Sequence, residues 1–383
     1  MNSIRDIFIL IIIVAIFSGC RAGDISELLP FPTVAPEIVI SEITQFSGLK
    51  EQTIGAKHVI AADTEGLLFQ DGEVVIGVDD IEINRTMFIN CQVFIKGRSN
   101  VEFHECIFTD LYQYEKAALN VSESANISVM RCGFSNNYIG MGIHNGQAEV
   151  RECRFENNNG HNALVIGEGS VAVVEGNYFY GNFPHAILVM NREESPQAKI
   201  DILGNIIEQT GEDAIDFEDY RHAAESLVAG NIIRNSGWSA VIVEYNSWDS
   251  TITISGNWIE GTGITWELPV HPLQPDEFQP GWGHGILVED SGGVTIENNR
   301  ILAAGGNGIE ISNGRDVLVK GNGINCGLAG IGAYGYNTMS LRREFSPLLS
   351  ENAGGTRATA TGNIIYEAET EYEIDERSEL SLD

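Results

Sequence analysis

Short stretches in which every second residue is apolar recur along most of this chain, and Gly, Asn and Ser separate them. Val294-Thr295-Ile296 and Gly308-Ile309-Glu310-Ile311 are typical. Alternation of this kind sends the apolar side chains of a β-strand to one face and the polar ones to the other. Gly, Asn and Ser favour turns between such strands. The pattern therefore predicts many short strands joined by tight turns.

One phrase repeats with a regular period: an Asn or Cys anchor followed by an alternating apolar stretch. Gly204-Asn205-Ile206-Ile207 and Gly230-Asn231-Ile232-Ile233 are clear copies. The anchors are Cys91, Cys106, Cys132, Cys153, Asn177, Asn205, Asn231, Asn257, Asn299, Asn322 and Asn363, and most steps are 21 to 28 residues. Such a period predicts a solenoid in which each coil buries its apolar face against the next. Asn suits the anchor because it tolerates a left-handed turn and its amide can donate and accept along the stack.

This repeat resembles that of the right-handed parallel β-helix proteins over roughly residues 83–365. The resemblance implies an all-β, right-handed parallel β-helix of about ten to twelve coils. Proteins with similar repeats include pectate lyases, polygalacturonases, alginate epimerases and lyases, and a periplasmic copper-site maturation protein. A fold shared so widely does not select one function.

The N-terminus resembles a bacterial lipoprotein signal. Arg5 is followed by an apolar run over residues 7–17 and by the lipobox-like Phe17-Ser18-Gly19-Cys20. The run is too short to span a membrane. The resemblance implies a signal at 1–19, an acylated Cys20, a tether at 20–36 and an exported protein, periplasmic or at the cell surface. A cleaved secretory signal with an incidental Cys is the alternative.

The net charge of the chain limits the kinds of molecule that it can bind. Lys and Arg number 22 against 54 Asp and Glu, giving a net charge of −32. A protein this acidic repels nucleic acid, and it repels uronate polymers unless a metal or a local Arg cluster intervenes. The predicted β-helix covers 37–366, with long anchor intervals that place loop insertions at 261–282 and 337–357. The acidic segment 367–383 is either a disordered tail or a charged cover that blocks edge pairing.

Four of the six cysteines occupy consecutive anchors, from Cys91 to Cys153. Neighbours on adjacent parallel strands have poor geometry for a disulfide, so we expect a buried thiol stack, with disulfides within it as the alternative. No CxxC pair or His/Cys cluster indicates zinc.

A polar column runs just before the small residue that opens a strand of each coil. It consists of Met141, Asn162, His185, Asp213, Ser239, His284, Asn307 and Ala329. On one face these side chains can hold a sugar, with His or Asp as acid or base and Ser239 and Asn307 as binding residues. The alternative is that strand-opening positions favour polar turn formers in any case.

A second column carries carboxylates: Glu218, Glu244 and Glu289. On neighbouring rungs they lie roughly 5 Å apart, which raises their pKa values or recruits a cation. Ca²⁺ is the expected ion, since Asp216, Asp219 and Asp290 lie nearby in sequence. A solvated acidic edge is the alternative.

Aromatic residues gather beside these columns. Trp266 and Trp282 lie in the first insertion, while Trp238 and Tyr245 flank the rung before it. Sugar rings stack on such faces, although rings that pin the loop to the solenoid would give the same pattern.

The resemblance to polygalacturonases is partial. Gly283-His284-Gly285-Ile286 matches their Gly-His-Gly-apolar motif, and Gly211-Glu212-Asp213-Ala214-Ile215 keeps one Asp of two in their acidic segment. The rung of Ser239 separates the two motifs and no Arg-Ile-Lys follows, so a standard polygalacturonase is not expected. For the cationic residues of β-helix lyases the nearest candidates are Arg192, Arg221 and Arg234.

Together these features predict an exported, lipid-anchored β-helix that binds a polysaccharide on its mid-helix face and cleaves it as a lyase or glycoside hydrolase. Asp213 is the expected acid or base, His284 its partner, Glu244 a second carboxylate or metal ligand, and His185 a further catalytic candidate. The alternatives are a non-catalytic surface scaffold or adhesin, and a periplasmic maturation-type accessory protein.

Overall fold

A computed structural model describes residues 48–53, 57–192, 195, 197–221, 223–247, 250–263, 283–334, 356–366, 368–374 and 378–382. The chain divides into two compact units, residues 1–35 and 36–383, and the first lies wholly outside the described residues. So do most of the two predicted insertions, at 264–282 and 335–355.

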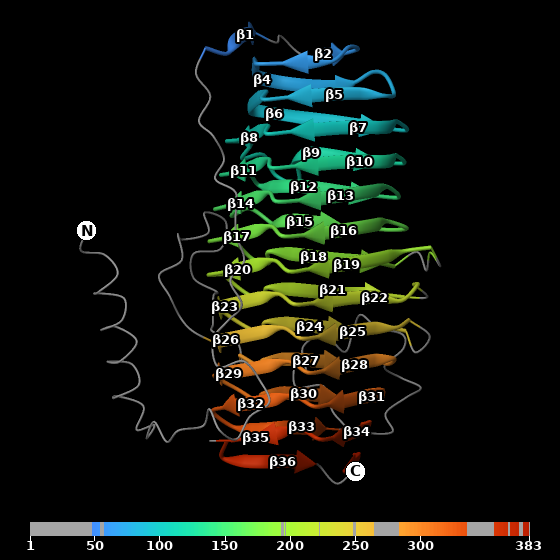
Figure 1. Ribbon diagram of the computed structural model, residues 1–383, viewed down its shortest axis with the longest axis vertical. Helices are drawn as coiled ribbons and strands as arrows, with labels where there is room; N and C mark the ends of the chain where they lie inside the picture. Colours follow the sequence, from blue (N-terminus) through green and yellow to red (C-terminus); the bar gives the residue numbers. More distant parts are fainter. Residues whose placement is uncertain are drawn as a thin grey trace, which may run out of the picture. The chain divides into compact units, whose positions relative to one another are not determined.

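All elements of the described ranges are β-strands, and they pair in parallel in two sheets of 24 and 13 strands. A regular rung has three strands, and successive rungs lie one above another from β4 (Leu67–Ile76) to β36 (Thr370–Ile374) (Figure 1). No helix in the described part of the chain is long and apolar enough to cross a membrane. The predicted all-β parallel solenoid is confirmed.

The first and second strands of each rung belong to the larger sheet. The first strands are β8 (Ile107–Thr109), β11 (Gly133–Ser135), β14 (Arg154–Glu156), β17 (Tyr178–Tyr180), β20 (Ile206–Glu208), β23 (Ile232–Ser236), β26 (Trp258–Thr262), β29 (Arg300–Ala304), β32 (Gly323–Cys326) and β35 (Ile364–Ile365). The second strands are β9 (Ala117–Ser122), β12 (Ile139–His144), β15 (Asn162–Ile166), β18 (Ile187–Asn191), β21 (Ile215–Tyr220), β24 (Val241–Glu244), β27 (Ile286–Glu289), β30 (Ile309–Ser312), β33 (Ala329–Tyr334) and β36 (Thr370–Ile374).

The third strands form the smaller sheet. They are β3 (Thr64–Glu65), β5 (Ile81–Asn84), β7 (Ser99–His104), β10 (Ala125–Met130), β13 (Gln147–Arg151), β16 (Val171–Glu175), β19 (Lys199–Leu203), β22 (Ser226–Ala229), β25 (Ile252–Ser255), β28 (Val294–Glu297), β31 (Arg315–Lys320), β34 (Arg357–Thr361) and β37 (Glu379–Leu382). The N-terminal strands β1 (Lys50–Thr53), β2 (Lys57–Ile60), β4 (Leu67–Ile76) and β6 (Met87–Lys96) complete the larger sheet.

The asparagine anchors form one buried ladder, as their period predicts. In a typical step, Oδ1 of Asn231 accepts hydrogen bonds from the backbone N and from Nδ2 of Asn205, at 2.9 and 3.0 Å. Nδ2 of Asn231 then donates to Oδ1 of Asn257 at 2.9 Å and to the backbone O of Ile202 at 3.0 Å. The left-handed residue of the turn is the one before the anchor, such as Gly204 with φ +57°. Asn is therefore used for its amide, and the preceding Gly supplies the conformation.

Cysteines extend this ladder upward, with one correction. The backbone N of Cys106 donates to Sγ of Cys132 at 3.3 Å, and that of Cys132 donates to Sγ of Cys153 at 3.4 Å. These cysteines are buried and free, and burial raises the pKa of Cys132 well above its usual range. Cys91 is not the next anchor, because Met87 pairs with Ile107 and so places Thr86 beside Cys106. The irregular step of 15 residues is thereby replaced by one of ordinary length.

The C-terminal acidic segment contains strands. β36 pairs with β33, and β37 pairs with β34, so both sheets continue beyond residue 366. The segment thus contributes a last rung to the solenoid, and positions 367, 375–377 and 383 lie outside the described residues.

A phenylalanine stack fills the upper core beneath the first strands. Phe108, Phe134 and Phe155 lie in register with ring centroids 4.7 and 4.6 Å apart, and Phe69, Phe88 and Phe179 extend the stack. Below Phe179 the same position becomes Ile207.

We expect Phe134→Ala to lower the free energy of unfolding by about 3–5 kcal/mol, since it opens a cavity between two stacked rings. Urea unfolding followed by circular dichroism measures the change. Tyr114→Ala, at a side chain that is 67% exposed, is the control and should shift stability by less than about 0.5 kcal/mol. Equal effects of the two substitutions would contradict this assignment of the core.

Candidate functional site

The strand pairing places the predicted polar column in register. Because Ile187 pairs with Ile215, Ile215 with Val241, and Val241 with Ile286, the residues two positions earlier stack as His185, Asp213, Ser239 and His284. Asn162 and Asn307 extend the column above and below. Met141 does not belong to it, since it pairs with Leu164 and lies in the core.

Column side chains also have a structural task at this corner of the solenoid. Oδ1 of Asp213 accepts a hydrogen bond from the backbone N of Ser239 at 2.9 Å, and Nδ1 of His284 accepts one from that of Asn307 at 3.1 Å. Asn162 and Asn307 accept the same kind of bond from His185 and Ala329. Turn stabilisation therefore explains why these positions are polar. It does not explain why one is Asp and two are His.

The three predicted carboxylates are in register as well. Glu218 pairs with Glu244, and Glu244 pairs with Glu289, along the second strands β21, β24 and β27. Their exposure falls down the column: the Glu218 side chain is 26% exposed, whereas Glu244 and Glu289 are buried. Oxygen atoms of Asp216, Glu218 and Glu244 all lie within 4.8 Å of one another. Asp216 points outward from the same strand as Glu218. The three close carboxylates are therefore Asp216, Glu218 and Glu244, whereas the sequence suggested Glu289 as the third member.

The polar column and this carboxylate group meet around His185. Its Nε2 lies 3.5 Å from Oδ2 of Asp216 and 3.8 Å from Oε2 of Glu212, and its Nδ1 lies 3.8 Å from Oδ2 of Asp213. We call His185, Glu212, Asp213, Asp216, Glu218 and Glu244 the acidic cluster. His185, Glu212 and Glu218 are its partly exposed members, with side chains 12%, 24% and 26% exposed.

Asp213 differs electrostatically from an ordinary carboxyl group. Burial raises the pKa of Asp213 well above its usual range, and the charges of Glu212 and Glu244 raise it further. The hydrogen bonds from Ser239 act in the opposite direction and are outweighed. A neutral, proton-bearing carboxyl group beside ionisable ones is the arrangement that glycoside-cleaving sites use for a general acid.

Cationic groups adjoin one side of the cluster. Nη2 of Arg192 lies 2.6 Å from Oε1 of Glu218, and Arg192 and Arg221 both pair with Asp219. Asp219 is thereby engaged by arginines, and Asp290 accepts a hydrogen bond from Asn313. Arg234 pairs instead with Glu208, on the first strands. Of the three candidates for the cationic residues of β-helix lyases, Arg192 and Arg221 are therefore the two beside the cluster.

His284 has a partner other than Asp213. Its Nε2 lies 3.2 Å from Oε2 of Glu310, and Nδ2 of Asn307 donates to the same oxygen at 2.9 Å. Burial lowers the pKa of His284, and the charge of Glu310 opposes this. Asp213 contacts His185 and Ser239, one rung to either side. The geometry thus favours His185 over His284 as the imidazole that works with Asp213.

Ring side chains occupy several rungs of the position one residue before the column. They are Tyr138, His161 and the half-buried Trp238, while Glu212 occupies the same position in the rung of Asp213. Tyr245 is buried directly after Glu244, in a left-handed conformation with φ +56°. Trp266, Trp282 and the predicted acylation site Cys20 lie outside the described residues.

Two exposed tyrosines that pack beside this position were not predicted from the sequence. Tyr112 is 44% and Tyr114 67% exposed, and both rings pack on Tyr138, with centroid distances of 6.0 and 5.5 Å. Tyr138 in turn stacks with His161. Desolvation lowers the pKa of His161 and the negative charge of Glu218 raises it, so His161 lies between the tyrosines and the acidic cluster. Their only sequence signal was Tyr112-Gln113-Tyr114 in a turn.

A family comparison agrees with this architecture. The family model described as "Right handed beta helix region" matches residues 63–205 and 276–345, more than half of the chain. The chain belongs to the right-handed β-helix family. This family assignment gives the hand of the β-helix; no curated protein sequence matches the chain.

Solved structures similar to this β-helix include carbohydrate-active enzymes. The catalytic domain of a GH87 α-1,3-glucanase in complex with nigerose is 13% identical, with a TM-score of 0.56, and the alignment covers 87% of this chain and 62% of that one. The A-module of a mannuronan C-5 epimerase from Azotobacter vinelandii is 11% identical, with a TM-score of 0.56 and coverages of 84% and 90%. The β-helix thus spans less than two thirds of the glucanase domain. Likeness at this identity shows the fold.

Proposed function

We propose that this β-helix binds a polysaccharide along its second strands and cleaves a glycosidic bond at the acidic cluster. The observation that carries the proposal is the buried Asp213 carboxyl group, whose pKa is raised beside Asp216, Glu218 and Glu244. Enzymes with a similar fold, an α-1,3-glucanase and a mannuronan C-5 epimerase, support a polysaccharide as the ligand class.

In this proposal Asp213 donates a proton to the glycosidic oxygen that leaves. In hydrolysis, water bonds to the sugar carbon as the glycosidic bond breaks and releases one proton. His185 contacts both Asp213 and Asp216, so it can pass that proton back to Asp213. Glu244, whose charge acts on Asp213, is the second carboxylate of the reaction or a ligand of a cation. Ser239 holds Asp213 in place through its backbone N–H and, with Asn307, remains a proposed sugar-binding residue.

Calcium is the proposed ion for the carboxylates of Asp216, Glu218 and Glu244. Three carboxylates within 4.8 Å offer the oxygen ligands that Ca²⁺ prefers, with further positions filled by water or by sugar hydroxyl groups. Glu289 lies one rung farther from Glu218 and is the proposed supporting carboxylate. The ion would hold the substrate and offset the mutual repulsion of the three side chains.

Export and lipid anchoring at Cys20 complete the proposal. An exported, membrane-anchored chain meets extracellular or periplasmic polysaccharide, and the net charge of −32 argues against a nucleic-acid partner. Radiolabelled palmitate incorporation that is lost in Cys20→Ala tests the anchor independently of the site.

A panel of polysaccharides incubated with the purified protein, with and without Ca²⁺, tests the activity. New reducing ends without ultraviolet absorbance indicate hydrolysis, whereas an unsaturated product that absorbs in the ultraviolet indicates a lyase. Binding without any product, unchanged by substitutions in the acidic cluster, would instead support the non-catalytic scaffold.

The exposed tyrosines give a separate test of the binding surface. We expect Tyr112→Ala and Tyr114→Ala each to weaken binding of a long oligosaccharide about two- to tenfold, since one aromatic contact contributes about 0.5–1.5 kcal/mol. Both side chains are exposed, so the unfolding midpoint should stay unchanged. Tyr180→Ala, on the first strand β17, is the matched control. Equal affinity of all three variants and the wild type would remove the tyrosines from the surface.

A further inference from the structure

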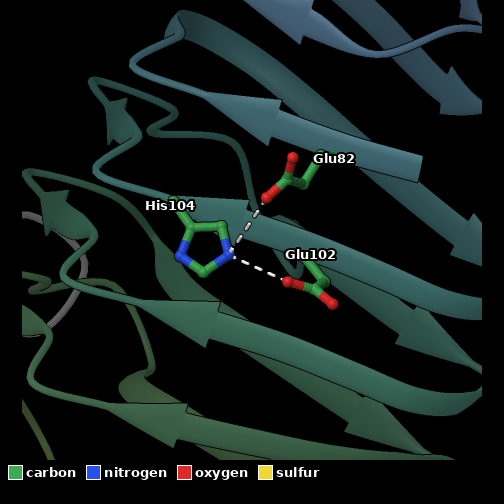
Figure 2. A group of neighbouring side chains, drawn as sticks. All are labelled: Glu82, Glu102 and His104. Carbon is green, nitrogen blue, oxygen red and sulfur yellow. Dashed lines mark hydrogen bonds and ion pairs between the residues drawn. The ribbon is translucent and has the colours of Figure 1, made fainter. Parts of the chain in front are cut away.

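Three metal-ligating side chains meet on the outer face of the smaller sheet. Glu82 of β5 pairs in register with Glu102 of β7, and His104 lies two residues farther along β7, on the same face. Figure 2 shows the three side chains turned toward one another, with His104 between the two carboxylates. None of them belongs to the acidic cluster, whose strand residues Asp216, Glu218 and Glu244 lie on the larger sheet.

The distances among these atoms suit a shared cation. Nε2 of His104 lies 3.0 Å from Oε2 of Glu102 and 3.9 Å from Oε1 of Glu82, and the three possible ligand atoms all lie within 4.8 Å of one another. When each ligand atom lies about 2.0–2.2 Å from one ion, the separations between the ligand atoms are close to those found among these three side chains. The side chains are 54%, 49% and 22% exposed for Glu82, Glu102 and His104, so water can reach the remaining coordination positions.

A lower rung of the same sheet has an ion pair in the equivalent position. Two rungs down, Glu149 occupies the position of Glu102, and Arg151 occupies that of His104. Arg151 is permanently charged and pairs with both Glu149 and Glu175. In the upper rungs the carboxylates of Glu82 and Glu102 face the imidazole of His104. Within the described ranges, His104 is the one cationic partner with which these two carboxylates pair. An imidazole, unlike a guanidinium group, is a metal ligand in its neutral form.

We propose that Glu82, Glu102 and His104 bind a divalent transition-metal ion of the Zn²⁺ type. One nitrogen and two carboxylate oxygens form a ligand set suited to Zn²⁺, whereas Ca²⁺ takes six to eight oxygen ligands. The two Glu charges balance the charge of the ion, which replaces the permanent cation that Arg151 supplies below. The ion links β5 to β7 and thereby stabilises an upper rung of the solenoid.

The site lies at the edge of a hollow on the same face. Glu102 lines this hollow of about 560 Å³ together with Asn100, Asn126, Ser128, Gln147 and Glu149. Water or a ligand in the hollow therefore has access to the side of the metal site that Glu102 forms. The metal site itself does not depend on the glycosidic activity proposed above.

Isothermal titration of the untagged protein with ZnCl₂, in buffer that contains saturating Ca²⁺, tests the proposal. We expect one Zn²⁺ site in the wild type, and at least a tenfold weaker one in Glu82→Gln and Glu102→Gln, since even outer-shell changes cost about tenfold or more. His104→Arg should abolish binding and keep the fold, because it recreates the Glu149–Arg151 arrangement. Zn²⁺ should raise the unfolding temperature of the wild type and not that of His104→Arg.

Glu149→Gln and Glu244→Gln are the controls, since they alter the lower ion pair and the acidic cluster without touching the triad. Both should bind Zn²⁺ as the wild type does. A wild type that takes up no Zn²⁺, or a His104→Arg variant that binds it with unchanged affinity, would overturn the proposal. Loss of the site in Glu244→Gln alone would also overturn it, by assigning the ion to the acidic cluster.

Discussion

Asp213→Asn should reduce turnover of the polysaccharide substrate by about 10²–10⁴-fold, the contribution of a general acid. The substitution removes the transferable proton and keeps a side-chain oxygen that can accept the hydrogen bond from Ser239. Asp213→Ala should lose the same activity and, in addition, lower stability, because it leaves the buried N–H of Ser239 without its acceptor. Comparing the two variants therefore separates the chemical task of the side chain from its structural one.

The pH dependence of the rate gives a second readout for Asp213. A general acid must be protonated, so the wild-type rate should fall as the pH rises through the raised pKa of Asp213. The residual rate of Asp213→Asn should lack this fall. An Asp213→Asn variant with wild-type turnover, or with the same alkaline loss of rate, would exclude Asp213 as the acid.

Stability should respond to pH in a defined direction at the same residue. The pKa of Asp213 is higher in the folded than in the unfolded protein, so the folded state binds the proton more tightly. The stabilisation it gives is complete below the ordinary pKa of an Asp and is lost as the pH rises through the raised value. The stability of Asp213→Asn relative to the wild type should accordingly increase with pH over that range, as measured by urea unfolding at several pH values.

Much of the fold was predictable because a solenoid repeats one local problem. Each coil places an alternating apolar stretch after an amide that bonds to the next coil, so Asn205, Asn231 and Asn257 reveal both period and register. The prediction of the register was wrong in the coil where the anchor is neither Asn nor Cys. Thr86 holds the anchor position above Cys106, and Cys91 attracted the assignment only because Cys follows in three later coils.

That error also hid the metal-ligating triad. Taking Thr86 as the anchor places Glu82 and Glu102 four residues before their anchors, side by side, as the pairing of β5 with β7 shows. Taking Cys91 instead aligns Glu102 with Met87, and no cluster emerges. If the register assumed for one coil is wrong, the sequence no longer predicts which residues of that coil contact the neighbouring coils.

Register alone predicted the acidic cluster only in part. It placed His185 beside Asp213 and Glu218 beside Glu244. It could not show that His284 turns toward Glu310, because side-chain direction follows from rotamers and packing rather than from spacing. Tyr112 and Tyr114 lie in a turn with no periodic pattern, so nothing in the spacing related them to Tyr138.

Asn231→Ala should lower the free energy of unfolding by about 3–6 kcal/mol, the largest effect on stability that we expect from a single polar side chain. Its amide makes four hydrogen bonds within the ladder and is fully buried. Removing it takes the acceptor of the backbone N–H of Asn205, one acceptor of the Asn205 Nδ2 and the side-chain donor of the Ile202 carbonyl, and each buried group left unsatisfied costs about 1–3 kcal/mol. Urea unfolding measures the loss.

Two further substitutions show whether the ladder itself is responsible. Asn231→Cys should recover part of the loss, since Sγ of Cys132 accepts from the backbone N of Cys106 and donates to the backbone O of Phe103 in the same position higher up. Asn363→Ala, at the partly exposed end of the ladder, should cost only about 1 kcal/mol, because water can replace the lost partners. If Asn231→Ala and Asn363→Ala cost the same, burial of the ladder is not what makes it stabilising. If Asn231→Cys is no better than Asn231→Ala, the cysteine rungs do not do the work of asparagine.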